Sequence, residues 1–285
     1  MKKINKKGIS LLLKLLLLVI MVMPVGFISA QSIVNLGTTT NYAILAGSTI
    51  TNTGTTTISG TTGVNVGLYP GTVFSGRASV VLNGEVHLAD TAANIAKADL
   101  VTAYNDVAGR LPVTRIPTEL GGTTLKPGVY DSADGTFQIT GTLTLDAEGN
   151  SNAVFIFKAA STIITASGSN VNLINSANSC QIFWKAGSSV TLGTNSHLVG
   201  HIFALTSITA NNGATVQGQL LARNGAVTLD TNTITNTICN EIQDTSTVNG
   251  GVLPNTANYL YDFLLGGAVL ILIGFIGFII KRRYE

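Results

Sequence analysis

The chain contains an internal repeat, and this repeat limits the folds that are open to it. Residues 201–218 (HIFALTSITANNGATVQG) align without a gap on residues 43–60 (AILAGSTITNTGTTTISG). Units of this kind, with short apolar stretches between Gly- and Asn-rich turns, cannot bury a core alone and must stack on one another. The repeat therefore predicts an all-β solenoid of parallel strands. Closer or looser copies follow at 180–200, at 219–236, and from points near Phe137 and Ala153.

Each repeat contains three strand-like pieces, as one coil of a triangular parallel β-helix would. The first pieces are apolar on both alternating sides, so their outer surface must be covered as well. Residues 90–109 (DTAANIAKADLVTAYNDVAG) predict one long α-helix with Asp90 as its N-cap and Gly109 at its end. We expect this helix to lie along the first pieces, which are 44–46, 154–157, 182–184, 202–204 and 220–222.

The second pieces alternate between apolar and polar residues, which predicts strands with one buried and one exposed side. Directly after each predicted inward residue (Ile50, Leu143, Ile164, Val190, Ile208 and Val227) comes a Thr. Stacked coils hold equivalent residues about 4.7–4.9 Å apart, so these Thr residues would form a continuous file. The file is Thr51, Thr144, Thr165, Thr191, Thr209 and Thr228, flanked two places earlier by Thr49, Thr142, Ile163, Ser189, Ser207 and Ala226 and, in the last coils, three places later by Thr194, Asn212 and Thr231.

Such a file has two interpretations. Thr is a common exposed strand residue, so a repeat can carry it for that reason alone. Alternatively, hydroxyls and poorly hydrated methyls on stiff side chains form a grid that can order water into an ice-like array. The third pieces are polar outside but differ from coil to coil, as in Asn170 and Asn172 against His197 and Val199. The regular face is therefore the better candidate for a lattice-like ligand.

Both ends of the chain read as targeting segments. Residues 1–30 combine basic residues, an apolar run and Ile28-Ser29-Ala30, which predicts a secretory signal peptide cleaved after Ala30. Residues 260–280 predict a transmembrane segment and 281–285 a basic cytoplasmic tail. Ahead of them, after a linker at 241–252, stands Leu253-Pro254-Asn255-Thr256-Ala257. This order resembles the sorting signal of proteins that sortases join to Gram-positive peptidoglycan, although Ala257 replaces the usual Gly; the alternative is a permanent membrane tether.

Charge and dispersed acidic residues exclude other classes. The two ends hold eight of the 16 basic and two of the 14 acidic residues, which leaves eight positive and 12 negative charges between them. A nucleic-acid binder would show the opposite balance. Polysaccharide-cleaving β-helices need clustered carboxylates, whereas the acidic residues here fall mostly in predicted turns. Asp131 and Asp134 read as turn formers, and His197 and His201 lack a third metal ligand. We predict no catalysis, no cofactor and no metal.

Two features stay open at this point. Residues 61–88 either form a cap over the end of the solenoid or present Tyr69, Phe74 and Arg77 as an exposed contact. Cys180 and Cys239 are an even pair in an exported protein and could form a disulfide. Their coils are separated along the solenoid, so that bond requires the segment after Asn236 to turn back.

The motifs YAILAGSTITNTG, TAYNDVAGR, GGTTLKPGVY, NAVFIFK, ASGSNVNLIN, IFWKAGSSVTLGTNS, LTSITANNGATVQG and LARNGAVTLDTNTIT occur in this order. Together they resemble the microbial ice-binding proteins of the DUF3494 type over roughly 35–240. The resemblance implies a discontinuous right-handed parallel β-helix over 31–240, with the N-terminal coil stacked beside the last coils. The family's usual pattern, Thr-Ala/Gly-x-Thr/Asn, is met in full only at Thr209-Ala210-Asn211-Asn212.

We therefore expect a secreted surface protein, anchored to the cell wall, that binds ice through the Thr file. Its partners would be the ice surface, a sortase, peptidoglycan and, before processing, the membrane. The alternative is a non-catalytic adhesin that binds a glycan or a protein on the same scaffold.

Overall fold

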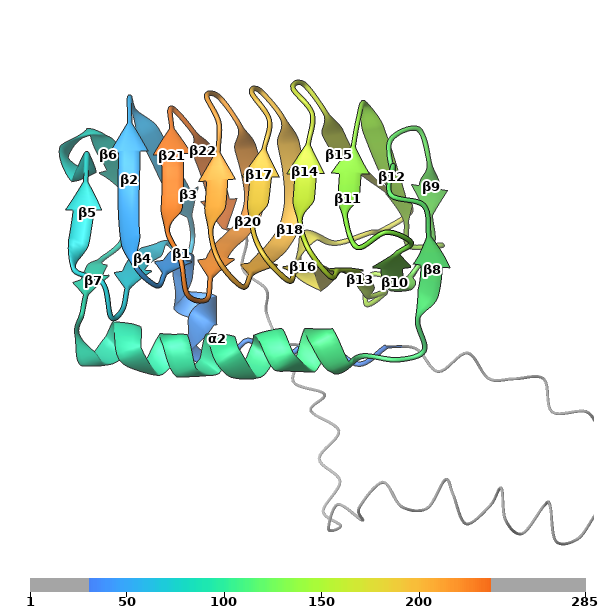
Figure 1. Cartoon of the computed structure of the whole chain (residues 1–285), viewed down its shortest axis with the longest axis horizontal. Coiled ribbons are helices and arrows are strands. Elements are labelled where there is room, and N and C mark those ends of the chain that lie inside the picture. The colour runs from blue at the N-terminus through green and yellow to red at the C-terminus, as the bar shows by residue number, and fades with distance from the viewer. Residues whose placement is uncertain (1–30, 237–285) are drawn as a thin grey trace, which may run out of the picture. The chain divides into compact units, whose positions relative to one another are not determined.

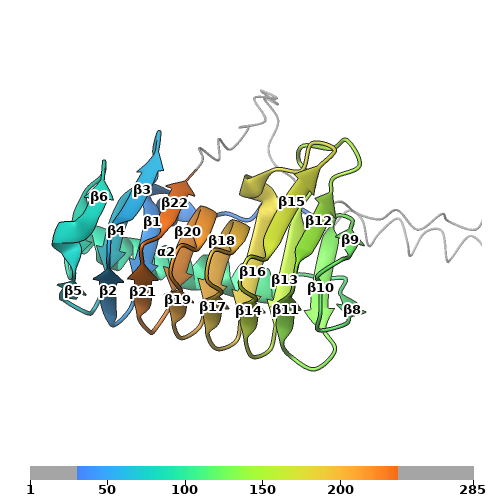
Figure 2. The same cartoon turned by 90° about the horizontal axis from the view of Figure 1, so that it is seen from above.

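The computed structural model describes residues 31–236, which form stacked coils of β-strands beside one long α-helix (Figures 1 and 2). Every strand pairing within these residues is parallel, in one 15-stranded and one 7-stranded sheet. Parallel pairing follows from the repeat, because each coil returns the chain to the same face in the same direction. The predicted all-β parallel fold with one helix is confirmed.

The first strand of each coil lies on what we call the helix-side face. These strands are buried on both sides, and all five residues of β1 (Tyr42–Ala46) are buried. The row runs in space through β7 (Val86–Leu88), β4 (Asn65–Leu68), β1, the second half of β20 (Thr215–Ala222), the second half of β18 (His197–Ala204), β16 (Ile182–Ala186), β13 (Phe155–Ala159), β10 (Gly128–Ser132) and β8 (Thr114–Ile116).

The second strand of each coil belongs to the seven-stranded sheet, whose outer surface we call the seven-stranded face. Burial alternates along these strands: in β17 (Val190–Leu192) the half-buried Thr191 stands between two buried neighbours. The spatial order is β5 (Val73–Ser75), β2 (Thr49–Thr53), β21 (Val227–Asp230), β19 (Ile208–Ala210), β17, β14 (Ile163–Thr165) and β11 (Phe137–Ile139).

The third face closes each coil. Its inward residues Ile58, Val171, Leu198, Val216 and Ile234 are at most 2% exposed. The row contains β6 (Val80–Leu82), β3 (Thr56–Gly60), β22 (Thr233–Asn236), the first halves of β20 and β18, β15 (Asn170–Ile174), β12 (Thr142–Asp146) and β9 (Thr124–Leu125); short 3-10 turns stand at η1 (Gly37–Asn41), η2 (Arg77–Ser79) and η3 (Ser179–Gln181).

The N-terminal coil is inserted out of sequence order. Strands β1, β2 and β3 stack directly on β20, β21 and β22, which lie more than 170 residues later in the chain. The pairs Ile44–Leu220, Ile50–Val227 and Ile58–Ile234 set the register. This is the arrangement that the gap-free alignment of the first and later repeats indicated.

Residues 61–88 do not form a separate cap. They form another coil, in which β4, β5 and β6 pair with β1, β2 and β3. The physical reason is that this segment keeps the inward apolar positions of a coil: Val66 and Leu68 are fully buried and Phe74 packs against the core. The predicted cap is therefore wrong in its form: no separate structure covers the end of the stack, and this added coil is itself the end.

An aromatic stack fills one part of the interior. The rings of Phe157 and Trp184 are stacked with centroids 4.1 Å apart, and Tyr130 stacks on Phe157 at 5.4 Å. These residues hold equivalent positions in successive coils, so the parallel register places ring on ring. The Trp184 Nε1 donates to the Val199 carbonyl at 2.8 Å, which satisfies the one polar atom that this large side chain buries.

Helix α2 (Thr91–Gly109) covers the helix-side face. Its N-cap Asp90 accepts a hydrogen bond from the Ala93 amide. Leu100 and other small or apolar residues of α2 form a second buried cluster with the outward residues of that face, such as Phe183 and Phe203. The Lys97 ammonium donates to the Ala222 carbonyl at 2.6 Å, so the helix is fixed by packing and by direct contact with β20.

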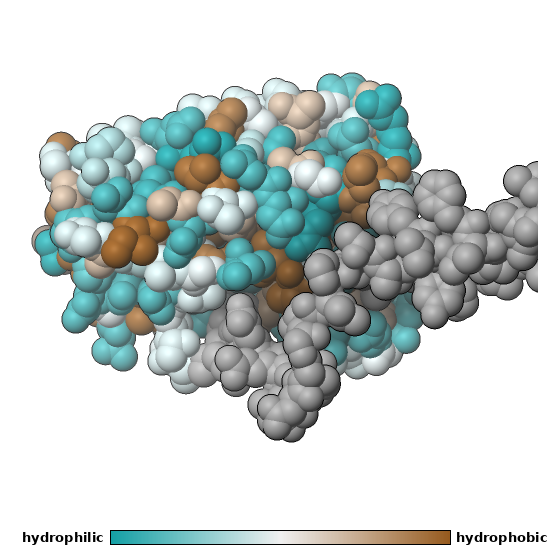
Figure 3. Space-filling model, turned by 90° about the horizontal axis from the view of Figure 1, so that it is seen from below, coloured by the Kyte–Doolittle hydropathy of each residue, from teal (hydrophilic) through white to brown (hydrophobic). Residues whose placement is uncertain are grey.

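On the side that carries α2, the apolar surface is broken into separate patches (Figure 3). Ile95 of α2 is 49% exposed and Leu111, just beyond it, is 71% exposed. No helix within residues 31–236 is long and apolar enough to cross a membrane.

Several predictions from the sequence fall outside the described residues. They are the signal peptide at 1–30, the linker at 241–252, the LPNTA motif at 253–257, the span at 260–280 and the tail at 281–285. Cys180 is buried within η3, whereas Cys239 lies outside the described residues, so their disulfide stays a prediction.

We predict that His201 makes the fold sensitive to acid. Burial lowers the pKa of His201 to about 4 from 6.5, although hydrogen bonds involving Gln219 and Cys180 act against this. Between these two pH values the unfolded chain binds a proton that the folded chain does not. Stability is therefore complete above about pH 6.5 and falls as the pH falls towards 4, by about 3 kcal/mol.

The test uses His201→Gln, because Gln219 is the register partner of His201 in the next coil. Urea unfolding near pH 7 and near pH 4 should show a smaller acid loss in this variant than in the wild type. An acid loss equal to that of the wild type would remove His201 from the explanation.

Candidate functional site

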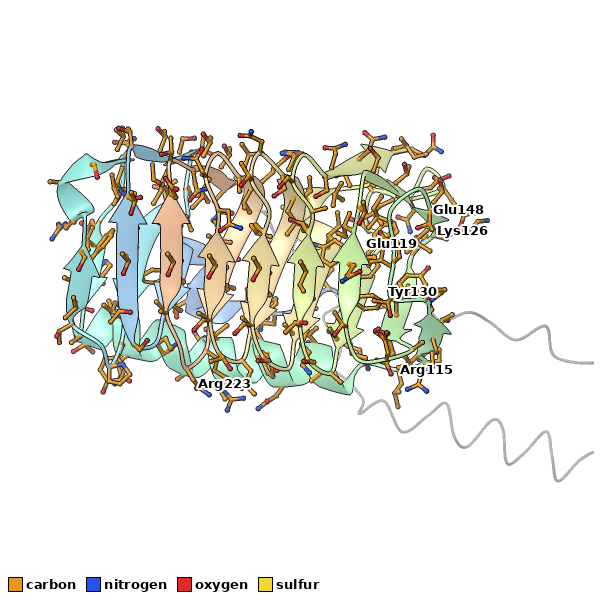
Figure 4. The ribbon with its side chains drawn as sticks, turned by 45° about the horizontal axis from the view of Figure 1, so that its top comes forward. Arg115, Glu119, Lys126, Tyr130, Glu148 and Arg223 are labelled. Carbon is orange, nitrogen blue, oxygen red and sulfur yellow. The ribbon has the colours of Figure 1, made fainter. Side chains whose placement is uncertain are left out.

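The outer surface of the seven-stranded sheet presents four Thr residues on adjacent strands. Thr191 pairs with Thr209, Thr209 with Thr228, and Thr228 with Thr51. We call these four residues the Thr row. Their hydroxyls follow one another at the strand spacing of about 4.7–4.9 Å on a hydrogen-bonded sheet that holds each side chain in place. Figure 4 looks onto this face.

The hydroxyls of the Thr row are available to solvent. None of the four forms a hydrogen bond with another residue of the described chain, and all four are exposed or half-buried. The Thr56 hydroxyl, by contrast, is buried and accepts a hydrogen bond from the Asn232 amide. The Thr row therefore keeps its full hydrogen-bonding capacity for an external ligand.

The prediction that Thr165 belongs to the exposed Thr file is wrong. Thr165 is 3% exposed and its hydroxyl accepts a hydrogen bond from the Gly193 amide at 2.8 Å, while Ile164 is 38% exposed and pairs with Thr191. The sequence Ile163-Ile164-Thr165 offers two adjacent apolar residues, so alternation alone allows either register. A shift of one residue exchanges the two faces. The structure buries Ile163 and places Ile164 in line with the Thr row.

Thr142 and Thr144 are also predicted wrongly. Both lie on β12, which belongs to the third face, where Thr142 pairs with Asn170 and Thr144 with Asn172. In that coil the seven-stranded sheet is formed by β11, and Gln138 pairs with Ile164 in line with the Thr row. The segment near Phe137 is thus the second piece of its coil, and the first piece is β10.

The complete outward file is longer than the Thr row. At the other end Ser75 pairs with Thr51, so the file reads Gln138, Ile164, Thr191, Thr209, Thr228, Thr51 and Ser75 across the sheet. Sequence reasoning missed Gln138, Ile164 and Ser75. The sequence signal for Ser75 is the apolar pair Val73-Phe74 just before it, which marks the second strand of a coil. The cap interpretation of 61–88 hid this signal.

The flanking residues two places earlier are small. Ser189 and Ser207 are half-buried, and their hydroxyls accept hydrogen bonds from the amides of Ser207 at 3.3 Å and Ala226 at 3.1 Å. Thr49 occupies the same position in β2 and is half-buried. The two Ser hydroxyls already accept hydrogen bonds from backbone amides. These small residues therefore contribute mainly to the shape of the surface beside the Thr row.

The predicted downstream residues Thr194, Asn212 and Thr231 lie at the turns that leave the sheet. Asn212 Nδ2 and Thr231 Oγ1 both donate to the Asp230 carboxylate at 3.0 Å. Asp230 pairs with the exposed Thr53 and is half-buried, so its charge faces outward at this edge. This edge therefore carries a charge, and its polar side chains hydrogen-bond with one another, whereas the Thr row is neutral.

The arrangement is suited to binding an extended surface. The Thr row offers methyls and free hydroxyls at one repeat distance with no charged side chain in the file. No group of three or more His, Cys, Asp or Glu residues that could hold a metal ion is found in the described part of the chain. Such a face can make many equivalent weak contacts at once.

Comparison with known proteins agrees with this geometry. The model of the ice-binding-like family matches residues 44–235. The chain belongs to this family. It is similar to an "Ice-binding protein" of Nostoc sp. (strain HG1), with 42% identity over 221 residues that cover 77% of this chain and 80% of the relative.

Solved structures of ice-binding proteins share the fold. One from an Antarctic biological consortium has a TM-score of 0.69 and 41% identity, covering 75% of this chain and 96% of its own. One from the ascomycete Antarctomyces psychrotrophicus has a TM-score of 0.67 and 34% identity, covering 72% of this chain and 98% of its own. In both cases the match spans nearly all of the solved chain.

The observed register predicts opposite behaviour for two adjacent residues. Thr165→Val should lower the free energy of unfolding by about 1–3 kcal/mol, because the Gly193 amide loses its buried acceptor. It should leave surface binding unchanged. Ile164→Thr should extend the Thr row and, as one added member of a cumulative contact, should keep or slightly raise thermal hysteresis. If Thr165→Val instead lowered thermal hysteresis in a folded protein, the assignment of the two faces would be wrong.

Proposed function

We propose that the seven-stranded face binds ice and that the Thr row is the centre of the contact. The observation that carries the proposal is the set of four adjacent, register-paired Thr residues whose hydroxyls form no hydrogen bond within the described chain. Membership of the ice-binding-like family supports the ligand. We propose in addition that the coils wind right-handed, the hand that parallel crossover connections take in nearly all proteins.

Binding would be cumulative. Each Thr contributes a methyl and a hydroxyl at a fixed position, and the rigid sheet has already lost the conformational entropy that a flexible site would lose on binding. Removal of a single hydroxyl should therefore matter little. A bulky residue in the middle of the row should matter much more, because it lifts the neighbouring side chains away from the surface.

The test compares one substitution on two faces. Thr209→Tyr places a large ring in the middle of the Thr row, whereas Thr233→Tyr places the same ring on the exposed part of the third face. We expect Thr209→Tyr to lose most of the thermal hysteresis and ice-recrystallisation inhibition and Thr233→Tyr to keep both, with similar melting temperatures. Equal losses in the two variants would rule out the seven-stranded face, and a folded wild-type protein without either activity would rule out ice as the ligand.

We propose that the protein acts outside the cell, attached to its surface. The supporting observations are the predicted signal peptide at 1–30, the LPNTA motif at 253–257 and the apolar segment with its basic tail at 260–285. A sortase would cut after Thr256 and join the new carboxyl group to peptidoglycan. This part of the proposal does not depend on the identity of the ligand.

The LPNTA motif offers its own control. In a sorting motif of the form LPxT the third position is free, so Asn255→Ala should remain covalently attached to the cell wall. Thr256→Ala should be lost from the wall fraction, as should the wild-type chain in a sortase-negative strain. Wall attachment that is the same in all of these cases would contradict sortase processing.

A further inference from the structure

The end of the stack formed by β5, β6 and β7 is hollow. A cavity of about 390 Å³ lies there between the three strands. Its floor consists of residues that would be core in any inner coil, and these are only partly buried because no further coil covers them. The lining includes Phe74, Val80, Leu82 and Val86, with Arg77 and Glu85 at the rim.

All three strands at this end have an unpaired edge. Strand β5 pairs with β2, β6 with β3 and β7 with β4, and none has a second partner in the described chain. Open parallel edges present unsatisfied backbone amides and carbonyls and are prone to pair with other strands. On β6, the outward side chain of Val81 is in addition 58% exposed.

The opposite end of the stack differs. Charged residues gather there, as Figure 4 shows for Glu119, Lys126 and Glu148. Glu119 accepts hydrogen bonds from the Gly121 and Thr140 amides, and Lys126 pairs with Glu148. Leu120 beside them is 1% exposed. Strands β8 and β9 at that end also lack a second partner, but Leu120 is part of the buried core there, so the uncovered apolar floor is specific to the end formed by β5, β6 and β7.

The two charges at the open end are placed on different corners. Arg77 lies between β5 and β6, and Glu85 lies between β6 and β7. Arg77 forms no ion pair with any described residue, and the Glu85 carboxylate pairs only with the His87 ring among them, at 3.3 Å. A two-fold rotation about the normal of the third face exchanges these two corners. When two copies meet end to end with this symmetry, Arg77 of each copy lies opposite Glu85 of the other.

We propose that two copies of this chain associate through their open ends, related by this two-fold axis. Strand β6 then meets its own counterpart in antiparallel orientation, and β5 of each copy meets β7 of the other. The apolar floors cover each other and the three pairs of edges gain partners. A rotation about the normal of the seven-stranded face would instead bring Glu85 opposite Glu85, which is why the charges favour the first arrangement.

Charge reversal tests the contact. Sedimentation of the chain from residue 31 to residue 253, at about 1 μM to 1 mM, should show a reversible dimer, the behaviour of a small transient interface. Arg77→Glu and Glu85→Arg should each raise the dimer dissociation constant by about tenfold or more. The double variant and an equimolar mixture of the two single variants should both restore association. Arg115→Glu, at the closed end, is the matched control and should have no effect.

A cysteine scan tests the axis. Val81→Cys would face its counterpart across paired antiparallel strands, where Cα atoms lie about 4.5–5.5 Å apart, within reach of a disulfide. It should give a covalent dimer on mild oxidation, whereas Ser75→Cys should not. The wild type, with its native cysteines, gives the background. A covalent dimer of Ser75→Cys alone would place the axis on the seven-stranded face and overturn the arrangement proposed here.

Other results overturn the proposal as a whole. A protein that stays monomeric throughout this concentration range contradicts the proposed dimer. A dimer that ignores both reversals, or that Arg115→Glu abolishes, uses a different surface. Circular dichroism should show that all variants are folded, because Arg77, Glu85 and Val81 are exposed. None of these measurements involves ice, so their outcome is independent of the proposed function.

Discussion

The parallel register between neighbouring coils determines every surface of this molecule. Each coil is short, and its few apolar side chains bury little surface until the coils above and below cover them. The backbone hydrogen bonds between coils fix which residues lie above one another, and this one choice sets both the interior and the exterior. The stacked rings of Phe157 and Trp184 and the aligned hydroxyls of Thr191 and Thr209 are two results of the same pairing.

The insertion of the N-terminal coil shows how far this dependence reaches. Thr51 joins the Thr row through pairing with a strand more than 170 residues away, and without that pairing the row would end at Thr228. The helix-side face depends on a long-range contact as well, because α2 comes from the segment between the N-terminal coils and the remainder. The candidate site is thus a property of the assembled stack, and no single repeat contains it.

Much of this arrangement could be predicted from the sequence, and the failures have a common cause. The repeat predicted parallel coils, and the uniform apolarity of the first pieces predicted that something covers them. Asp90 and Gly109 predicted where the covering helix begins and ends. Alternation also placed Thr191, Thr209 and Thr228 where the coils are regular. It failed at Thr165, where Ile163 and Ile164 allow two registers, and at Thr142 and Thr144, where an irregular coil hid its own second strand. Hydrogen bonds to backbone amides, such as that of Thr165, leave no trace in a hydropathy pattern.

Helix α2 links the size of the seven-stranded face to another part of the chain. The chain must travel from the coil of β7 to the coil of β8 along the outside of the stack, and α2, with 19 residues, covers about 28 Å of that path. Each added coil would widen the seven-stranded face by about 4.8 Å and would demand about three more helical residues. Three residues turn a helix by about 300°, about 60° short of a full turn, so its apolar stripe would rotate by that amount relative to the face that it covers. A larger face therefore requires paired insertions, one in the coils and one in the segment that runs along them, which is mostly helix.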